Sequence, residues 1–334
     1  MREHLDLLAE GHHLTESQAR ALLDEMTDPE MDSIQAGAAL VALRLKGETA
    51  DEVRGFALRL RELAIRPDTP VDVPAVDVVG TGGDGSGSLN LSTGSALLAA
   101  ATGVPVIKHG NRSISSSSGS ADVLEALGMP LPLDPAAAAQ SLDRTGFTFL
   151  FAPAYHPAMK SIAPVRRSLG LRTIFNIAGP LANPATPPFH VIGAYSAGMA
   201  ETMANTMAGM PIERGFVVHG EPGWDEATPV GPYRLFDVTP GSVSASIEDP
   251  LEFGFARCSP EDLSGSDAVF NATQIREVFA GRMGAHRDAL VLGASLALRV
   301  TGVSTVDAIE RSMAAIDDGS AERLVDGIDQ RAHV

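Results

Sequence analysis

The sequence predicts an α/β protein with two parts: a helical N-terminal domain, and a larger α/β domain built on a central, partly parallel sheet. In the first part, apolar residues recur at helical spacing, and a proline-marked break follows at Pro67–Pro74. Beyond the break, short β-branched runs alternate with Ala- and Leu-rich segments. Strands that alternate with helices favour parallel pairing. The chain has 334 residues, of which 44% are apolar, and is long enough for two domains.

The expected helical domain spans residues 1–66. Capping boxes begin at Thr15 and at Thr49, and each opens a segment with apolar residues at helical spacing. The Ala- and Leu-rich stretch Ile34–Leu45 is expected to pack against a partner helix or a second subunit. Helices near residues 156–170 are expected to pack on this domain as well.

The expected α/β domain spans residues 74–334. Two further strands are expected within Tyr233–Phe255, and helices within Asp267–Arg282 and Asp288–Gln330. The β-branched or aromatic runs expected as strands are Val73–Val79, Val104–Ile107, Thr148–Phe151, His190–Tyr195 and Gly215–Val218. The helices expected between them include Ser95–Ala101, Asp122–Leu127 and Met199–Met207.

The composition excludes several classes of function. A formal net charge of -17 repels polyanions, so neither nucleic acid nor an anionic membrane is expected as a partner. The single cysteine, Cys258, leaves no internal disulfide and no cysteine-based zinc site. No apolar run is long enough to span a bilayer, and residues 1–10 lack the layout of a signal peptide. A cytoplasmic protein is therefore predicted.

A glycine-rich segment follows the first expected strand. It reads Gly-Thr-Gly-Gly-Asp-Gly over Gly80–Gly85, and Asn90–Thr93 opens the next expected helix. Glycines let backbone N–H groups approach an oxyanion, and a helix N-terminus adds a positive field. The segment is neither a P-loop nor a dinucleotide-binding fingerprint. A structural turn would also explain the glycines, but the polar start of the helix favours phosphate binding.

Cations follow in two further segments. Lys108–Arg112 ends the second expected strand and leads into the Ser- and Gly-rich run Ser113–Ser120. Such a run is typical of a linker, but between a strand and a helix it is suited to closing over a phosphorylated ligand. Farther on, His156, Arg166 and Arg172 belong to a basic stretch that is either a solvated face or a set of partners for a carboxylate.

Asp225 and Glu226 are adjacent acids in a loop after the strand expected at Gly215–Val218. Adjacent acids on a surface are most often solvated, whereas carboxylates at a strand end also suit Mg2+, which keeps waters and bridges to phosphates. Both interpretations remain open from these residues. His109 and His156 lack the spaced partners of a zinc site, so transition-metal binding is not expected.

In this order, the motifs resemble the anthranilate phosphoribosyltransferases, enzymes of tryptophan biosynthesis with a nucleoside-phosphorylase-like fold. The resemblance covers nearly the whole chain, and Gly80–Gly85 together with Lys108–Arg112 is its most specific part. The segments that carry it are Lys46–Thr49, Gly80–Gly85, Asn90–Thr93, Lys108–Arg112, Ser118–Asp122, Tyr155–Met159, Arg172–Asn176, Gly179–Pro184 and Asp225–Glu226. It implies a homodimer, formed through the helical domain, that transfers phosphoribosyl from phosphoribosyl pyrophosphate (PRPP) to the amine of anthranilate.

The resemblance also implies roles for individual residues. The PRPP-binding positions are Gly80, Gly82, Gly83, Asp84, Asn90, Ser92, Thr93, Lys108 and Ser120. The anthranilate-binding positions are Gly80, His109, Asn111, Tyr155, His156, Arg166, Gly179 and Pro180. Two Mg2+ ions are expected on Ser92, Asp225 and Glu226. Asn111 and Arg166 would position the acceptor, with Arg166 facing its carboxylate, and no residue is expected to act as a general base.

The chemistry of the implied reaction agrees with these residue types. An aromatic amine is a weak base that is unprotonated at neutral pH, so it can attack without a strong general base. The larger task is to stabilise the negative charge that builds on the departing pyrophosphate, with oxocarbenium-like character at C1 of the ribose. Backbone amides, Lys108 and Mg2+ suit that task.

The sequence departs from the family pattern at Ser117, where many members carry lysine, and at Ala178, Ala182, Pro222–Trp224 and Gly293. Because Ala178 lies beside the expected acceptor pocket, another aminobenzoate or aromatic acceptor remains an alternative. A pyrimidine-nucleoside phosphorylase is a more distant alternative. Its phosphate loop opens with Lys-His-Ser-Thr-Gly-Gly, whereas this chain has Val-Val-Gly-Thr-Gly-Gly.

Overall fold

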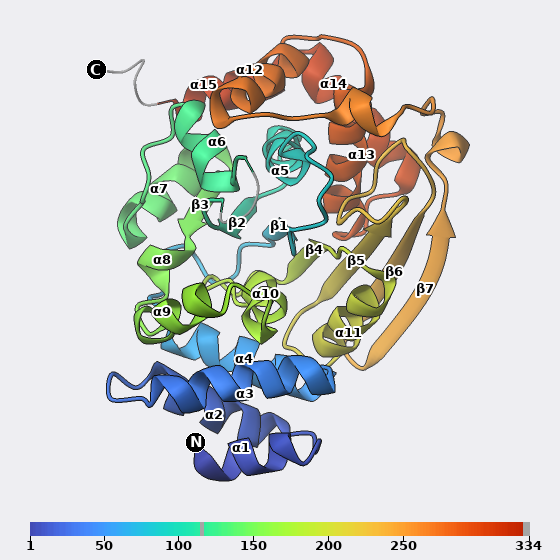
Figure 1. Ribbon diagram of the computed structural model, residues 1–334. Helices are drawn as coiled ribbons and strands as arrows, with labels where there is room; N and C mark the ends of the chain where they lie inside the picture. The colour runs from blue at the N-terminus through green and yellow to red at the C-terminus, as the bar shows by residue number, and fades with distance from the viewer. Residues whose placement is uncertain (114–116, 330–334) are drawn as a thin grey trace.

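A bundle of four N-terminal helices adjoins a body built on one sheet (Figure 1). The computed structural model describes residues 1–113 and 117–329. The bundle consists of α1 (Arg2–Ala9), α2 (Glu16–Thr27), α3 (Ser33–Lys46) and α4 (Ala50–Leu63). Thr15 and Thr49 form the expected capping boxes of α2 and α4. Within the described ranges, no helix is both long and apolar enough to cross a membrane.

The sheet has seven strands in the order β3-β2-β1-β4-β5-β6-β7. The five strands from β3 to β5 pair in parallel, and β6 and β7 pair antiparallel, which confirms a central, partly parallel sheet. In chain order the strands are β1 (Val76–Gly80), β2 (Val106–Gly110), β3 (Phe147–Phe151), β4 (Phe189–Gly193), β5 (Arg214–Gly220), β6 (Tyr233–Thr239) and β7 (Ser242–Glu248).

The direction of winding changes between β1 and β4. From β1 the chain adds β2 and β3 on one side, and it then returns to add β4 and β5 on the other. The last residues of the two central strands, Gly80 and Gly193, are register partners. Ligands of open α/β sheets bind outside the carboxyl ends of the strands at such a switch point.

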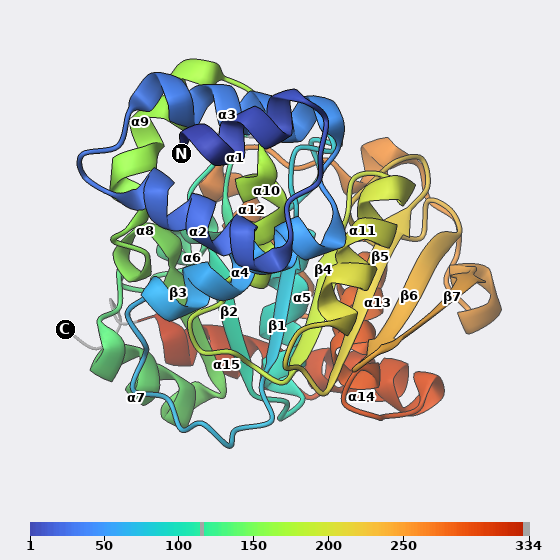
Figure 2. The same cartoon turned by 90° about the horizontal axis from the view of Figure 1, so that it is seen from below.

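Helices cover both faces of the sheet (Figures 1 and 2). One buried apolar cluster joins Val78 of the sheet to helices such as α5 and α13, and includes Leu97 and Leu290. The helices of this side are α5 (Leu91–Ala101), α6 (Ser120–Ala126), α7 (Pro135–Thr145), α12 (Ala268–Phe279), α13 (Ala285–Arg299), α14 (Thr305–Asp317) and α15 (Ser320–Ile328). Helix α7 was not expected from the sequence, although Asp134 caps it and Pro135 occupies its first turn, a typical helix start.

The opposite face of the sheet shares its core with the N-terminal bundle. A second cluster joins Ile192 and Val217 of the sheet to Phe56 of α4 and to Phe175. The rings of Phe56 and Phe175 meet edge to face, with their centroids 5.5 Å apart. Between bundle and sheet lie α8 (Ala152–Tyr155), α9 (Met159–Leu169), α10 (Ile174–Ala178), the 3-10 turn η1 (Gly179–Leu181) and α11 (Ala197–Ala208). Ile162 of α9 is buried in this cluster, so α9 packs on the bundle. Bundle and body are therefore held together by a continuous core.

Candidate active site

The loop after β1 brings the expected phosphate-binding glycines to the switch point. Gly82 and Gly83 have φ angles of +68° and +72°, a conformation that residues with a side chain rarely adopt. The Gly82 N–H donates to Asp225 Oδ2 at 2.6 Å. A Cβ atom at Gly80 would lie 2.5 Å from the same oxygen. The loop therefore packs against Asp225 without room for a side chain at Gly80.

The start of α5 adds polar groups beside this loop. Asn90 precedes the helix, donates to the Ser118 carbonyl at 3.1 Å and accepts from Asn271 Nδ2 at 2.7 Å. Thr93 is buried, and its hydroxyl has no hydrogen-bond partner within residues 1–113 and 117–329. Because α5 has eleven residues, its N-terminal end adds a positive field to these donors.

Lys108 places a buried cation under the loop. It lies in β2 with 1% of its surface exposed, and its Nζ donates to the Val78 carbonyl and to Ser92 Oγ at 3.4 Å. Burial lowers the pKa of Lys108, while the charges of Asp77, Glu226 and Asp225 oppose this shift. The amine is therefore surrounded by carboxylates that favour its charged form.

The acidic pair lies directly opposite this cation. Asp225 follows β5, and its backbone approaches β4 so closely that a Cβ atom at Gly193 would overlap the Asp225 carbonyl. Burial, and to a smaller extent the charge of Asp84, raises the pKa of Asp225 to about 7. Burial, and to a smaller extent the charge of Asp225, raises the pKa of Glu226 well above its ordinary value. Carboxylates of like charge thus crowd one another in a buried position.

These residues suit a hard divalent cation. Ser92, Asp225 and Glu226 offer oxygen atoms only, and a cation between the acids would offset the repulsion that raises both pKa values. Across the described part of the chain, no group of three or more His, Cys, Asp or Glu side chains is arranged to hold a metal ion alone. A metal here would need further ligands from water or phosphate, which is how Mg2+ commonly binds.

Two histidines meet on the other side of β2. The Nε2 atoms of His109 and His156 are 3.2 Å apart, and the ring centroids are 5.0 Å apart. Burial lowers the pKa of His156 to about 4 and that of His109 well below its usual value. The Gly179 carbonyl also lies against His109. The structure thus brings three of the expected acceptor residues together as a neutral, polar group.

The other expected acceptor residues are more dispersed. Arg166 lies in the last turn of α9, stacks 4.9 Å from the centroid of the Phe175 ring, and pairs with no carboxylate within the described ranges. Asn111 is exposed at the end of β2. The Tyr155 hydroxyl donates to the Leu133 carbonyl at 3.1 Å and so faces the core. Pro180 is buried in η1. The roles of these residues in binding remain predictions.

Two family models match this chain. The helical bundle domain of the glycosyl transferase family matches residues 2–64, and the a/b domain of the same family matches residues 72–322. Curated anthranilate phosphoribosyltransferases are similar over the full length. That of Desulforudis audaxviator is 44% identical, over 100% of this chain and 98% of the relative. The enzyme of Methylobacterium radiotolerans is 45% identical, over 96% of this chain and 93% of the relative.

Solved structures agree. The crystal structure of anthranilate phosphoribosyltransferase from Thermus thermophilus has a TM-score of 0.91 and 37% identity, over 99% of both chains. The Saccharomyces cerevisiae enzyme in complex with PRPP and Mg has the same fold, with a TM-score of 0.84 and 24% identity over 96% of this chain and 93% of the yeast chain.

This chain belongs to the anthranilate phosphoribosyltransferase family. The resemblance drawn from the motifs is confirmed, and so is the expected fold. Membership of the anthranilate phosphoribosyltransferase family carries the activity for which the family is named, a step of tryptophan biosynthesis. The alternative of a pyrimidine-nucleoside phosphorylase is thereby set aside.

For a member of this family, the structure adds contacts at the Gly80–Gly85 loop that the sequence did not predict. The Arg172 guanidinium donates to the Gly83 carbonyl and lies 4.0 Å from the centroid of the Tyr195 ring, directly over the phosphate loop. Arg44 of the bundle donates to the Arg172 carbonyl at 2.9 Å. Only the basic character of that stretch hinted at such a role.

The Ser- and Gly-rich run lies beside the start of α5, where Asn90 donates to the Ser118 carbonyl. Ser120 begins α6, and Ser117 Oγ donates to the Ser266 carbonyl at 2.7 Å. Residues 114–116 of the run lie outside the described residues, so its expected closure over a ligand stays a prediction.

Proposed function

We propose that the chain transfers phosphoribosyl from PRPP to the amine of anthranilate at the switch point between β1 and β4. The observation that carries this proposal is the convergence of the Gly80–Gly85 loop, Lys108 and the pair Asp225–Glu226. Gly82 N–H donates to Asp225, and the charges of Asp225 and Glu226 act on Lys108, so three motifs that are distant in the sequence lie together. Full-length relatives that are 44% and 45% identical to this chain bear this enzyme name, and the yeast relative was solved with PRPP and Mg.

In this proposal the phosphate groups of PRPP lie against the glycine loop and the start of α5. The backbone N–H groups of the loop, the hydroxyls of Ser92 and Thr93, and the Lys108 ammonium supply donors that are already in position. Ser92, Asp225 and Glu226 would hold Mg2+, two ions in our proposal, which when bound neutralises charge on the pyrophosphate. Donors that surround the pyrophosphate lower the cost of releasing this anion.

The acceptor would lie on the side of β2 that carries His109. Arg166, which lacks a carboxylate partner in the described part of the chain, would bind the anthranilate carboxylate through two parallel hydrogen bonds. The neutral pair of His109 and His156 adds no charge beside the amine. Asn111 would help to hold the amine near C1 of the ribose, and positioning of this kind contributes much of a rate enhancement.

A fluorescence assay with several acceptors tests the proposal. Anthranilate is expected to be consumed only when both PRPP and Mg2+ are present, at a rate at least tenfold above those of 3-aminobenzoate and 4-aminobenzoate. In these two isomers the carboxylate and amine are farther apart, and they cannot reach Arg166 and C1 together. Faster consumption of either isomer would identify another aminobenzoate as the acceptor and contradict this part of the proposal.

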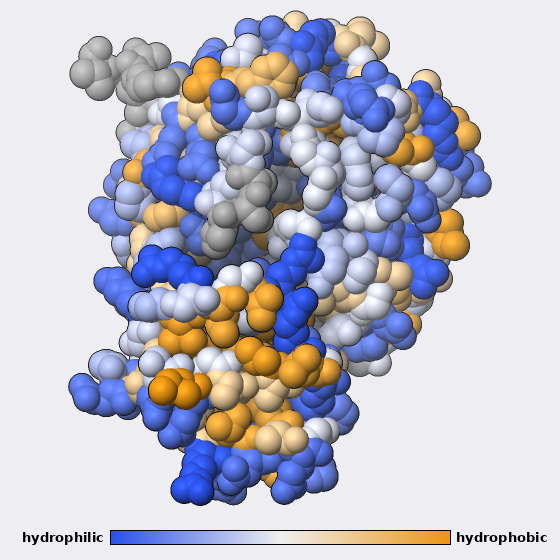
Figure 3. Space-filling view, in the orientation of Figure 1, coloured by the Kyte–Doolittle hydropathy of each residue, from blue (hydrophilic) through white to orange (hydrophobic). Residues whose placement is uncertain are grey.

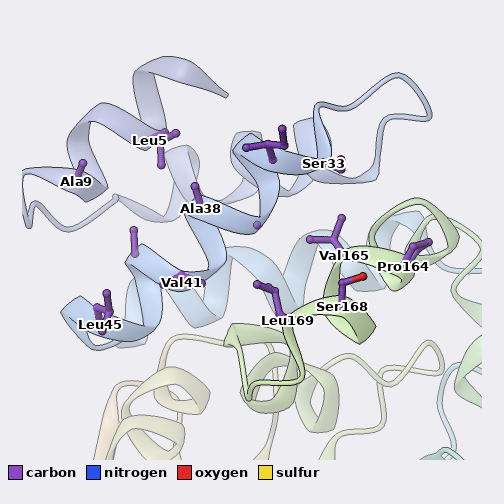
Figure 4. Close-up of a pocket in the computed structure, with 13 residues that line it drawn as sticks. Leu5, Ala9, Ser33, Ala38, Val41, Leu45, Pro164, Val165, Ser168 and Leu169 are labelled. Carbon is purple, nitrogen blue, oxygen red and sulfur yellow. The ribbon is translucent and has the colours of Figure 1, made fainter.

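We also propose that the protein is a cytoplasmic homodimer whose subunits meet through the N-terminal bundle. An open groove of about 780 Å³ lies between α1, α3 and α9, and apolar side chains line most of it (Figure 4). Hydrophobic residues gather over this part of the molecule (Figure 3). Ile34, Ala38, Val41 and Leu45 of α3 follow the 4-3-4 spacing of a helix-packing seam, with 81% of Ile34 and 82% of Leu45 exposed.

A second copy of the chain suits this seam. The small residues of α3 allow close approach of another helix, and a twofold axis lets one surface bind its own copy. We expect Ile34→Asp with Leu45→Asp to convert the dimer to a monomer in light scattering. Val269→Asp with Val306→Asp is the control, because these valines are also exposed but lie outside the groove. A monomeric wild type, or a dimeric Ile34/Leu45 variant, would contradict this interface.

A further inference from the structure

A buried carboxylate lies beneath both halves of the proposed site. Asp77 is the second residue of β1 and has no exposed surface. One of its oxygens accepts from the backbone N–H of His109 at 3.2 Å, and the other accepts from Asn183 Nδ2 at 2.9 Å. Asn183, also fully buried, donates to the Ile107 carbonyl at 2.8 Å. Asp77 thus binds the end of β2 directly and through Asn183.

Asp77 is also the shared counter-charge of two buried cations. Lys108 of β2 is one of them, and Asp77 is the largest influence opposing the loss of its charge. The other is Arg61 of α4, which has 4% of its surface exposed. Burial lowers the pKa of Arg61 to about 10, and the charge of Asp77 opposes this shift. One cation belongs to the sheet and the other to the N-terminal bundle.

Arg61 reaches the wall of the acceptor pocket. Its Nε donates to the Leu181 carbonyl at 2.7 Å, and Leu181 ends the turn that contains Gly179 and Pro180. The two terminal nitrogens of Arg61 have no hydrogen-bond partner in the described ranges. A buried guanidinium with free donors is costly, and a nearby carboxylate offsets part of that cost. The buried charge of Asp77 therefore acts on a cation of the sheet, Lys108, and on a cation of the bundle that holds the acceptor wall, Arg61.

We infer that Asp77 is a positioning residue for the transfer reaction. With Asn183, it fixes the end of β2 from which Lys108 faces the phosphate loop and His109 faces the acceptor pocket. Its charge also favours the charged form of Arg61, which holds the Leu181 carbonyl of the acceptor wall. This inference rests on the proposed function, since it concerns the same site. Asp77 touches neither substrate and acts only through the residues that it holds.

The test compares Asp77→Asn with a matched control. Asparagine keeps the size of Asp77 but has only one side-chain oxygen. It can accept from the His109 N–H or from Asn183, and its own amide N–H groups then face the other donor. We expect kcat to fall about 10- to 100-fold, because small misplacements at a reacting centre carry costs of that order. The control is Glu52→Gln, a fully buried carboxylate in α4 that accepts from backbone N–H groups of Leu14 and Thr49. It is expected to lower the melting temperature and leave kcat unchanged.

The pH dependence separates positioning from simple stability. Burial raises the pKa of Asp77 to about 6. The charges of Lys108 and Arg61 and the hydrogen bonds from Asn183 and His109 oppose this rise. The register partner of Asp77, His190, is neutral because burial lowers the pKa of its imidazole. The carboxylate is therefore charged at pH 8 and protonated in part below pH 6. The ratio of wild-type to Asp77→Asn kcat is expected to shrink as the pH falls from 8 to 5.5, because the wild type then loses the same charge. A constant ratio would overturn the inference.

A second variant covers the case in which Asp77→Asn does not fold. Arg61→Met removes the charge from the bundle side and leaves the Leu181 carbonyl without its donor. We expect it to raise the KM for anthranilate at least fivefold more than the KM for PRPP. If the KM values of Arg61→Met for anthranilate and PRPP both equal those of the wild type, Arg61 does not act on the acceptor wall. An inactive wild type would instead contradict the proposed function, so the two failures are distinguishable.

Discussion

Replacing Arg166 by alanine is expected to raise the KM for anthranilate roughly 10- to 100-fold and to leave the KM for PRPP within about twofold. This range follows from the loss of charge-assisted hydrogen bonds, worth about 1.5–3 kcal/mol. Arg166 is suited to this role because its guanidinium is partly buried, stacks on Phe175 and has no carboxylate partner in the described residues. Steady-state kinetics with each substrate varied in turn would measure both constants.

The neighbouring arginine provides the control. Arg167→Ala removes the same charge from the next position of α9, where the side chain is exposed. Both constants are expected to stay near those of the wild type. If Arg166→Ala raises the two KM values equally, the residue does not bind the acceptor carboxylate. If Arg167→Ala behaves like Arg166→Ala, the effect is one of overall charge and not of a specific contact.

The acidic pair is expected to give the largest loss of activity. We expect Asp225→Asn and Glu226→Gln each to lower kcat by about 100-fold or more and to raise the Mg2+ concentration needed for half-maximal rate. Each change keeps the shape of the side chain and removes one of the crowded charges, so folding is expected to be retained. Initial rates over a Mg2+ titration at saturating PRPP would measure both effects.

A nearby acid outside the pair sharpens this test. Glu221→Gln changes a carboxylate at the end of β5 that is exposed to solvent. Its Mg2+ titration is expected to match that of the wild type. If the Mg2+ titrations of Asp225→Asn and Glu226→Gln both match that of the wild type, the two residues are not Mg2+ ligands. They would then be structural partners of the Gly80 loop.

Much of the fold follows from local patterns in the sequence. The β-branched runs at 73–79, 104–107, 148–151, 190–195 and 215–218 all correspond to strands, because each is bounded by turn residues and flanked by helical segments. The order of the strands could not be deduced, since pairing of β1 with β4 joins residues more than a hundred positions apart. Helix α7 was not predicted, although Asp134 followed by Pro135 is a typical helix start.

The candidate site was predictable where it depends on strand ends. Gly80 ends β1, Lys108 lies two residues before the end of β2, and Asp225 follows β5, and the carboxyl ends of parallel strands meet at one edge. The site was not predictable where it depends on side-chain direction. Arg172 reaches back to Gly83 from another segment, and the hydroxyl of Tyr155 faces the core. Asp77 looks like an ordinary strand residue until its partners on three other segments are known.

The most direct test of the proposed reaction measures both of its products. The purified protein is incubated with PRPP, Mg2+ and limiting anthranilate, and mass spectrometry follows the ribosylated product while a coupled assay follows pyrophosphate. We predict one pyrophosphate released for each anthranilate converted to a product heavier by one phosphoribosyl group, and no reaction without Mg2+. Pyrophosphate release without that product, or conversion of another amine in preference to anthranilate, would contradict the proposed function.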